Sequence, residues 1–327
     1  MKIQKTGYHG LYFPDLGLSV DGFHREAKYT FVSHAHADHM PRNRSAKALA
    51  TTPTIDLMRK RGFKGNGKSL EFGESVETDR FKVTLYPAGH ILGSAMIFID
   101  SEEGTLLYTG DYRTPPSPAS EGFESPPNTD ILITEATFSL PIYRWKSHNE
   151  LKEEIQNFAL ESLENGFTPV FLGYNLGKAQ EIMHLLAPLN LPVQIHGAGY
   201  KLCSVYEKHG IDLGNYSAYD RQTCEENILV CPSSALANGF ASNVSRKRIA
   251  YCSGWAANES RRTQLTVDKL IPLSDHLDFF ELIEYCKKLS PRKTYITHTP
   301  NPDVVRHYLE KENLEAAFLN VERESED

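Results

Sequence analysis

The chain has 327 residues, of which 40% are hydrophobic and 24% are charged, values that exclude an intrinsically disordered chain. The length allows two domains, or one domain with a large insertion. A formal net charge of −7 argues against a surface that binds nucleic acid non-specifically, although it remains compatible with a local basic groove. Without a membrane-length apolar run, a signal-peptide core or a CxxC pair, the sequence predicts a cytoplasmic protein with reduced cysteines and no membrane contact.

The first half of the chain is predicted to form short β-strands that end beside metal-binding or acid–base side chains. The strand in KYTFVSH runs into a histidine cluster, and three further strands end near His90, Asp111 and Glu135, in RFKVTLYPAGH, GTLLYTGD and DILITEA. Sheets of α/β proteins build their sites by delivering such groups to one edge. We therefore expect a site at the carboxyl ends of these strands.

The pattern changes near Lys146. Residues 148–166 are predicted to form an amphipathic helix, and buried strands then alternate with helices as far as RIAYCSGW, which predicts a parallel sheet. After Leu273 the chain returns to the earlier pattern, with a helix, the strand KTYITH that ends at His298, and a final helix. We expect one domain formed by residues 1–145 and 271–327, with a second α/β domain inserted at 146–270 and a frayed terminal segment at 321–327.

The segment GFKGNGKS at residues 62–69 fits the P-loop pattern GxxxxGK[ST]. A P-loop follows a strand and opens a helix whose amino terminus faces the phosphates. Here a helix is predicted before the segment and strands after it, so the context is reversed. We interpret the segment as a glycine-rich basic loop rather than a nucleotide site.

The segment SHAHADHM at residues 33–40 places three histidines and an aspartate close together after a strand. One interpretation is a surface turn rich in histidine, and the other is half of a two-metal site. In an extended loop His34 and His36 point the same way and can bind one ion, while Asp38 and His39 turn toward a second. The missing ligands are expected at strand ends, namely His90, Asp111 and His298, with Asp111 bridging two divalent ions, zinc or alternatively manganese.

The motif HAHADH resembles the signature of the metallo-β-lactamase fold. This resemblance implies an α/β architecture, a four-layer αββα sandwich with a dinuclear metal site at the sheet edge. Asp21, in LSVDGF, matches the family's strand-end aspartate better than Asp15 does, and would orient the site rather than bind metal. His90, in AGHILGSA, and Asp111, in GDYR, match the family's third and fourth motifs.

Five further segments resemble the β-CASP branch of this fold: GHILGSA, ITEATF, SGW…SRR, LSDHLDF and ITHTP, in that order. The branch comprises nucleases acting on DNA or RNA, in which an inserted domain caps the site. Glu135, His276 and His298 match its motifs A, B and C. The GLYFPDLGLSVDGF and ITEATFSLPIYRW segments are most similar to bacterial ligase-associated DNA exonucleases, and the branch also includes mRNA 3′-end processing factors.

The resemblance implies hydrolysis of a phosphodiester by a hydroxide generated between two metal ions. His276 would protonate the leaving alkoxide, and Glu135 would hold its ring and favour its protonated form. An alternative reading is that His276 simply begins a helix capped by Ser274 or Asp275. The predicted catalytic residues are Asp38, His276, Glu135 and Asp21.

The predicted substrate is nucleic acid, bound through Arg261, Arg262, Arg113 and Lys178. We expect a DNA exonuclease of repair or end processing, with a DNA ligase or helicase as partner. His298 at motif C is more typical of RNA-acting members, so an RNA-processing nuclease is the alternative. A small-molecule hydrolase and an inactive assembly subunit are less favoured, because the inserted domain and the full set of expected ligands argue against them.

Overall fold

The computed structural model describes residues 1–7 and 9–319, so the terminal segment for which we expect fraying lies outside the described residues. The chain divides into two compact units. The first comprises Met1–Pro116, Ser120–Pro141 and His276–Asp327, and the second comprises Ser117–Ala119 and Ile142–Asp275. Each unit has its own sheets and helices.

The described part of the first unit contains two sheets. One has six strands in chain order: β1 (Gln4–Thr6), β2 (Gly10–Phe13), β3 (Leu18–Val20), β4 (Tyr29–Phe31), β5 (Lys47–Thr51) and β6 (Asn66–Leu70). The other has seven, in the order β19 (Ala316–Phe318), β18 (Lys293–Thr297), β11 (Ile131–Glu135), β10 (Gly104–Tyr108), β9 (Ala95–Ser101), β8 (Phe81–Pro87) and β7 (Ser75–Glu77). The helices of this unit are α1 (Thr52–Lys60), α7 (Phe279–Leu289) and α8 (Pro302–Lys311).

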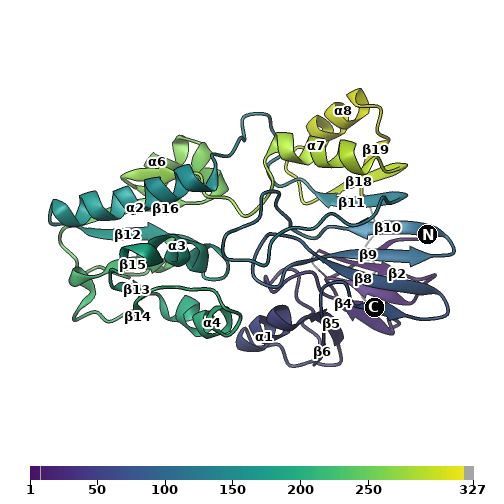
Figure 1. The fold of residues 1–327 in the computed structure, drawn as a ribbon, viewed down its shortest axis with the longest axis horizontal. Coiled ribbons are helices and arrows are strands. Elements are labelled where there is room, and N and C mark those ends of the chain that lie inside the picture. The colour runs from purple at the N-terminus through teal and green to yellow at the C-terminus, as the bar shows by residue number, and fades with distance from the viewer. Residues whose placement is uncertain (8, 320–327) are drawn as a thin grey trace. The chain divides into compact units, whose positions relative to one another are not determined.

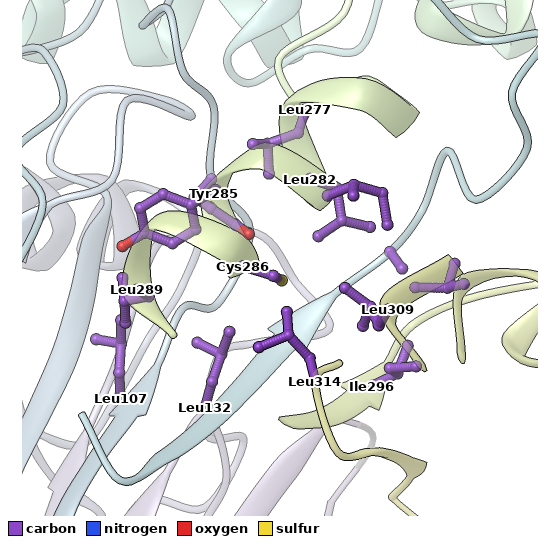
Figure 2. Packing of buried hydrophobic residues seen from close by; sticks show 14 of the residues in the cluster. Leu107, Leu132, Leu277, Leu282, Tyr285, Cys286, Leu289, Ile296, Leu309 and Leu314 are labelled. Carbon is purple, nitrogen blue, oxygen red and sulfur yellow. The ribbon is translucent and has the colours of Figure 1, made fainter. Parts of the chain in front are cut away.

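Two apolar clusters cover opposite faces of the seven-stranded sheet. Leu106 belongs to a cluster that also contains Phe13 and Phe31 of the six-stranded sheet. Its neighbour Leu107 belongs to a cluster with α7 and α8, shown in Figure 2. Because side chains of a strand alternate between faces, consecutive buried leucines mean that the sheet is covered on both sides. The first unit is thus an α/β sandwich in which two sheets share one core.

Helices α7 and α8 lie beside β18 and β11 in Figure 1. Helix α7 begins at a capping box, in which Asp278 Oδ1 accepts hydrogen bonds of 2.8 Å from the backbone N–H groups of Phe280 and Glu281. The sequence had suggested Ser274 or Asp275 as the cap, and this was wrong, because the first free N–H groups of the helix are those that Asp278 reaches. His276 therefore lies before the helix, in the loop that leads to it.

The second unit is built on a sheet in which every strand pairing is parallel, as the alternation of strands and helices predicted. Its described strands have the order β14 (Tyr216–Ala218), β13 (Val193–Ile195), β15 (Ile228–Cys231), β12 (Thr168–Leu172), β16 (Lys247–Cys252) and β17 (Lys269–Ile271). The helices are α2 (His148–Glu164), α3 (Lys178–Leu186), α4 (Gly197–Lys208), α5 (Ser233–Ala237) and α6 (Ser260–Leu265), with short 3₁₀ turns η1 (Ala187–Leu189), η2 (Cys224–Glu226) and η3 (Gly254–Ala257).

The P-loop-like segment has the reversed context that the sequence predicted. Helix α1 precedes it, and Gly67, Lys68 and Ser69 lie within strand β6, which pairs with β5. The lysine and serine of the pattern are therefore in an extended strand and not at a helix amino terminus. Among the described helices, none is both long and apolar enough to cross a membrane.

Candidate metal centre

The ends of six strands of the first unit carry most of the predicted site. Strands β8, β10, β11 and β18 run in one direction, since β8 and β10 are each antiparallel to β9, whereas β10, β11 and β18 pair in parallel. In the other sheet β3 and β4 are parallel. The residues at or just beyond these six ends are Asp21, His34, His90, Asp111, Glu135 and His298.

A first cluster of ligand atoms is formed by His34, His36, His90 and Asp111, whose ligand atoms all lie within 4.8 Å of one another. His36 Nδ1 is 3.1 Å from His34 Nε2 and 3.2 Å from His90 Nε2. Asp111 Oδ2 is 3.5 Å from His34 Nε2. Burial, and the neighbouring histidines after it, hold the pKa of His34 well below its ordinary value, so this ring stays neutral, the form that binds metal.

A second cluster contains His39, Asp111 and His298, again with ligand atoms within 4.8 Å of one another. His39 Nε2 is 3.6 Å from Asp111 Oδ2 and 4.0 Å from Asp38 Oδ2. Burial raises the pKa of Asp38, but a hydrogen bond from His9 and the charge of His39 outweigh it and hold this pKa well below its ordinary value. Asp111 belongs to both clusters, which is the arrangement expected of a carboxylate shared by two ions.

The donor set fits divalent metal ions. Imidazole nitrogens and carboxylate oxygens suit zinc, and carboxylates with imidazoles also suit manganese. His298 Nδ1 is buried and has no hydrogen-bond partner among the described residues. A buried nitrogen left in this way costs about 1–3 kcal/mol, and a metal ion bound at this nitrogen would remove that cost. Burial also holds the pKa of His298 well below its ordinary value, which keeps the ring neutral and able to bind metal.

Asp21 orients the histidines of the site, but it belongs to neither of the two ligand clusters that contain Asp111. Its carboxylate accepts hydrogen bonds from Ser33 N at 2.7 Å, Ser33 Oγ at 2.6 Å and Tyr108 Oη at 2.9 Å, and lies 2.8 Å from His39 Nδ1. His39 therefore donates from Nδ1 and turns Nε2 toward Asp111. Since Ser33 Oγ gives its proton to Asp21, it can accept one from His34 Nδ1 at 3.0 Å, which leaves His34 Nε2 facing the site.

The electrostatics of His39 follow from these carboxylates. Burial alone would lower its pKa, but attraction to Asp111, Asp21 and Asp38 outweighs burial and raises the pKa to about 9. Burial raises the pKa of Asp111 to about 6, although the charge of His39 opposes the rise. In the metal-free protein His39 is thus protonated at neutral pH, held between carboxylates that a metal ion would otherwise neutralise.

Three backbone positions at the site require a left-handed conformation. Gly110, just before Asp111, has φ +54°, and a Cβ there would lie 2.7 Å from the side chain of Ser33. Asp21 has φ +50° and His298 has φ +45°, values that are uncommon for residues other than glycine. Such conformations are retained where the surrounding structure over-determines them, most often at functional sites.

His276 and Glu135 form a second polar unit next to the first cluster. His276 Nδ1 lies 2.7 Å and 2.9 Å from the two carboxylate oxygens of Glu135, so Nδ1–H donates and Nε2 is left for other partners. Glu135 is 2% exposed and also accepts hydrogen bonds from Tyr112 N and Thr137 Oγ1. The ring of His276 lies 4.7 Å from that of His90, centroid to centroid. The hydrogen bonds from Tyr112 and Thr137 therefore hold the Glu135 carboxylate in place, and the carboxylate in turn orients the imidazole of His276.

The four predicted substrate-binding cations differ in exposure. Arg113 and Lys178 are each 1% exposed, and Lys178 Nζ pairs with Glu181 at 2.9 Å and Asp275 at 3.4 Å. Arg262 is exposed and Arg261 half-buried. Arg113 lies in the first unit, and the other three cations lie in the second. Their roles in substrate binding stay predictions.

One residue near the ligands had no signal in the sequence. His9 Nε2 lies 3.2 Å from Asp38 Oδ2, and its ring lies 3.8 Å from that of His298. A single histidine in TGYHG has no metal-ligand spacing and follows no predicted strand, so motif reasoning could not select it.

No family model matches the chain. Over 293 residues it is 34% identical to a probable DNA ligase of Opitutus terrae, a match that covers 89% of this chain and 28% of that protein. Over 199 residues it is 27% identical to the RNase aCSPSF2 of Saccharolobus solfataricus, covering 51% of this chain and 40% of that protein. A solved protein of unknown function from Enterococcus faecalis V583 resembles the fold, with a TM-score of 0.62 and 14% identity over 89% of this chain and 79% of that one.

The curated relatives confirm the resemblance that the motifs predicted, namely to nucleases of the metallo-β-lactamase fold. Within that class, the chain is a homologue of the β-CASP branch. It spans less than half of the length of the two curated relatives described above.

Proposed function

We propose that the chain is a metal-dependent phosphodiesterase acting on nucleic acid, and that its substrate is DNA, which it degrades as an exonuclease in repair or end processing. The observation that carries this proposal is Asp111, shared by two clusters of ligands, with the His276–Glu135 pair beside them. A single-metal hydrolase needs no shared carboxylate. A hydrolase whose substrate has a good leaving group needs no general acid, whereas a hydrolase that expels an alkoxide does.

The proposed ligands of one ion are His34, His36, His90 and Asp111, and those of the other are Asp38, His39, Asp111 and His298. When bound, two divalent ions would lower the pKa of a bound water molecule and offset the charge of the scissile phosphate. Zinc is the proposed metal, with manganese as the alternative. The chain's own contribution is to orient the ligands, through Asp21 and Ser33, before metal arrives.

His276 is the proposed general acid. Because Nδ1–H is committed to Glu135, the proton available to the leaving oxygen is the one on Nε2. Glu135 is itself held by Tyr112 and Thr137, so the imidazole is fixed in one orientation. Arg261 and Arg262 are the proposed contacts to the substrate backbone, since neither is buried, whereas the burial of Arg113 and Lys178 favours a structural role for those two.

DNA is proposed over RNA on the strength of the relative named a probable DNA ligase, whose match spans 89% of this chain. The match to the RNase aCSPSF2 spans 51%, and an RNA-processing nuclease is the second candidate for that reason. A DNA ligase is the proposed partner on the same ground, with a helicase as the alternative.

The proposed architecture is the four-layer αββα sandwich with an inserted β-CASP domain. Support comes from the two clusters on either face of the seven-stranded sheet, and from the contacts of α1 with β5 and β6 of the other sheet. We propose that the second unit corresponds to the insertion expected at 146–270, and the first to residues 1–145 and 271–327.

The proposed substrate is tested with protein reconstituted with zinc or with manganese. End-labelled single-stranded DNA, double-stranded DNA and matched RNA are incubated with it, and products are followed over time. The proposal expects a ladder that shortens from one end of the DNA. Degradation of RNA alone would overturn the choice of DNA, and cleavage of no polynucleotide would overturn the nuclease proposal.

The proposed acid is tested by His276→Ala. Loss of a general acid is expected to lower kcat by about 10²–10⁴-fold with little change in metal content, because His276 belongs to neither proposed ligand set. His307→Ala is the matched control, an exposed histidine of α8 in the same unit, and should leave kcat unchanged. If His276→Ala kept full activity, another group would have to supply the proton.

A further inference from the structure

The connection between strands β1 and β2 brings a histidine from outside every recognised motif to the second metal cluster. The two strands pair antiparallel, with Thr6 opposite Gly10, and His9 directly precedes β2. His9 Nε2 lies 3.2 Å from Asp38 Oδ2. These two side chains and His39 have ligand atoms within 4.8 Å of one another.

The backbone around His9 is fixed by close packing. A Cβ on Gly10 would lie 2.6 Å from Gly22 Cα, and one on Gly22 would lie 2.9 Å from Gly10 Cα, so the two segments touch backbone to backbone. Thr6 Oγ1 donates a hydrogen bond of 2.5 Å to the carbonyl of Phe23. Gly22 directly follows Asp21. The strand pair that carries His9 is therefore anchored on the segment that orients His39.

Asp38 is the proposed ligand that most needs support. Its side chain is 47% exposed, whereas those of His39 and Asp111 are 2% and 11% exposed. A half-exposed carboxylate can rotate into water, and each rotamer lost on metal binding lowers the affinity. His9, with a side chain 22% exposed, is in place to hold Oδ2 of this carboxylate, the oxygen that also lies 4.0 Å from His39 Nε2.

We propose that His9 is a positioning residue for the second metal ion, donating Nε2–H to Asp38 Oδ2. The inference rests on the proposed two-ion function and adds to it a partner for Asp38 from outside the ligand sets. The ring of His9 also lies against that of His298, 3.8 Å between centroids at 79°. A purely packing role through this ring is the competing explanation, and substitutions can separate the two.

The test uses the full chain, stripped of metal and titrated with Co²⁺ and, in competition with a chelator, with Zn²⁺. Four proteins are compared: the unsubstituted chain, His9→Ala, His9→Gln and His9→Phe. Glutamine keeps an N–H donor near the position of Nε2 without the ring, and phenylalanine keeps the ring without the donor. The readouts are the number of ions bound, the dissociation constant of each, and the visible absorption of bound Co²⁺.

Loss of a partner to a metal ligand typically weakens metal binding about 10–100-fold. We expect this loss for the second ion in His9→Ala and His9→Phe, with the first ion unchanged, and near-normal binding in His9→Gln. Normal binding by His9→Phe with weak binding by His9→Gln would overturn the proposal in favour of ring packing. Equal weakening of both ions in all three variants would overturn it in favour of a general structural effect.

The outcome for the unsubstituted chain separates this inference from the proposed function. If that chain binds fewer than two ions, the two-ion function fails and His9 has no second ion to support. If it binds two ions and all three variants bind them equally well, the two-ion function stands and the role of His9 alone is wrong.

Discussion

Among single residues, Asp21 determines how the histidines beside it can act. Its carboxylate accepts hydrogen bonds from Ser33, Tyr108 and His39. Because Ser33 Oγ donates to Asp21, it accepts from His34 Nδ1, and this fixes the tautomer of His34. Outer partners of this kind orient metal ligands and raise their basicity. The same negative charge contributes to the raised pKa of His39, which ties metal binding to proton release.

Binding of the second ion is expected to release a proton from His39. The pKa of about 9 means that His39 is protonated at pH 7.5 in the metal-free chain, whereas a metal ligand must be neutral. Calorimetric titration with Zn²⁺ in buffers of different ionisation enthalpy should show this release. The apparent affinity should rise about tenfold per pH unit between about pH 6, above which Asp111 has lost its proton, and pH 9, and level off above it, because one proton competes with the ion in this range.

Asp21→Asn provides the control for this proton release. The amide oxygen of asparagine can still accept a hydrogen bond from His39 Nδ1, but the substitution removes one of the charges that raise the pKa of His39. Fewer protons should therefore be released per ion bound at pH 7.5. Release that is the same in the variant, or an affinity that does not change with pH, would contradict the assignment to His39.

At the scale of helices and strands, the start of α7 sets where His276 lies. Asp278, two residues after His276, is the N-cap of the helix, and its backbone N–H donates a hydrogen bond of 2.9 Å to the carboxylate of Glu281. The helix then buries Leu282 and Cys286 in the cluster of Figure 2. The loop that carries His276 is thereby held at its end by the N-cap of α7 and by the packing of α7 in the apolar cluster.

Asp278→Ala is expected to lower the free energy of unfolding by about 1 kcal/mol, the usual cost of a lost N-cap. Asp278→Asn keeps a side-chain oxygen that can accept the same N–H groups and should lose only a few tenths. Urea unfolding at constant m-value measures both. Asp303→Asn on α8 is the matched control, since Asp303 is not the N-cap residue of that helix and makes only an exposed ion pair with Arg306; it should be close to neutral. Equal losses in the Ala and Asn variants of Asp278 would contradict the cap.

Sequence periodicity predicted the strands that deliver the ligands, because alternating or continuous apolar runs reflect local burial. The ends of β8, β10, β11 and β18 lie close to where the runs stop. The cap of α7 was misplaced, since three residues able to cap a helix occur within five positions and only backbone geometry chooses among them. His9 and the burial of Lys178 depend on contacts between distant segments, which no local pattern encodes.

For the whole molecule, the division into two units separates the metal ligands from the tryptophans. Every proposed ligand lies in the first unit, whereas the two tryptophans of the chain, Trp145 and Trp255, lie in the second. Tyr143 lies beside both, with ring centroids 6.0 Å and 5.9 Å away, within the second unit. Tryptophan emission therefore reports on unfolding of the second unit, whereas metal binding stabilises the first unit.

Removal of metal by a chelator is expected to lower the thermal transition of the first unit by about 5–10 °C for each ion removed. An ion at about 100 times its dissociation constant stabilises the folded state by about 2.7 kcal/mol, and each kcal/mol shifts the transition by about 2–4 °C in a domain of this size. Calorimetry should show the shift, while the transition followed by tryptophan emission stays in place. His298→Ala, which removes one ligand, should reduce the calorimetric shift. If the tryptophan transition instead moved with the calorimetric one, the two units would unfold as a single cooperative body, and the free energy of metal binding would be shared by the entire chain rather than confined to the unit that holds the ligands.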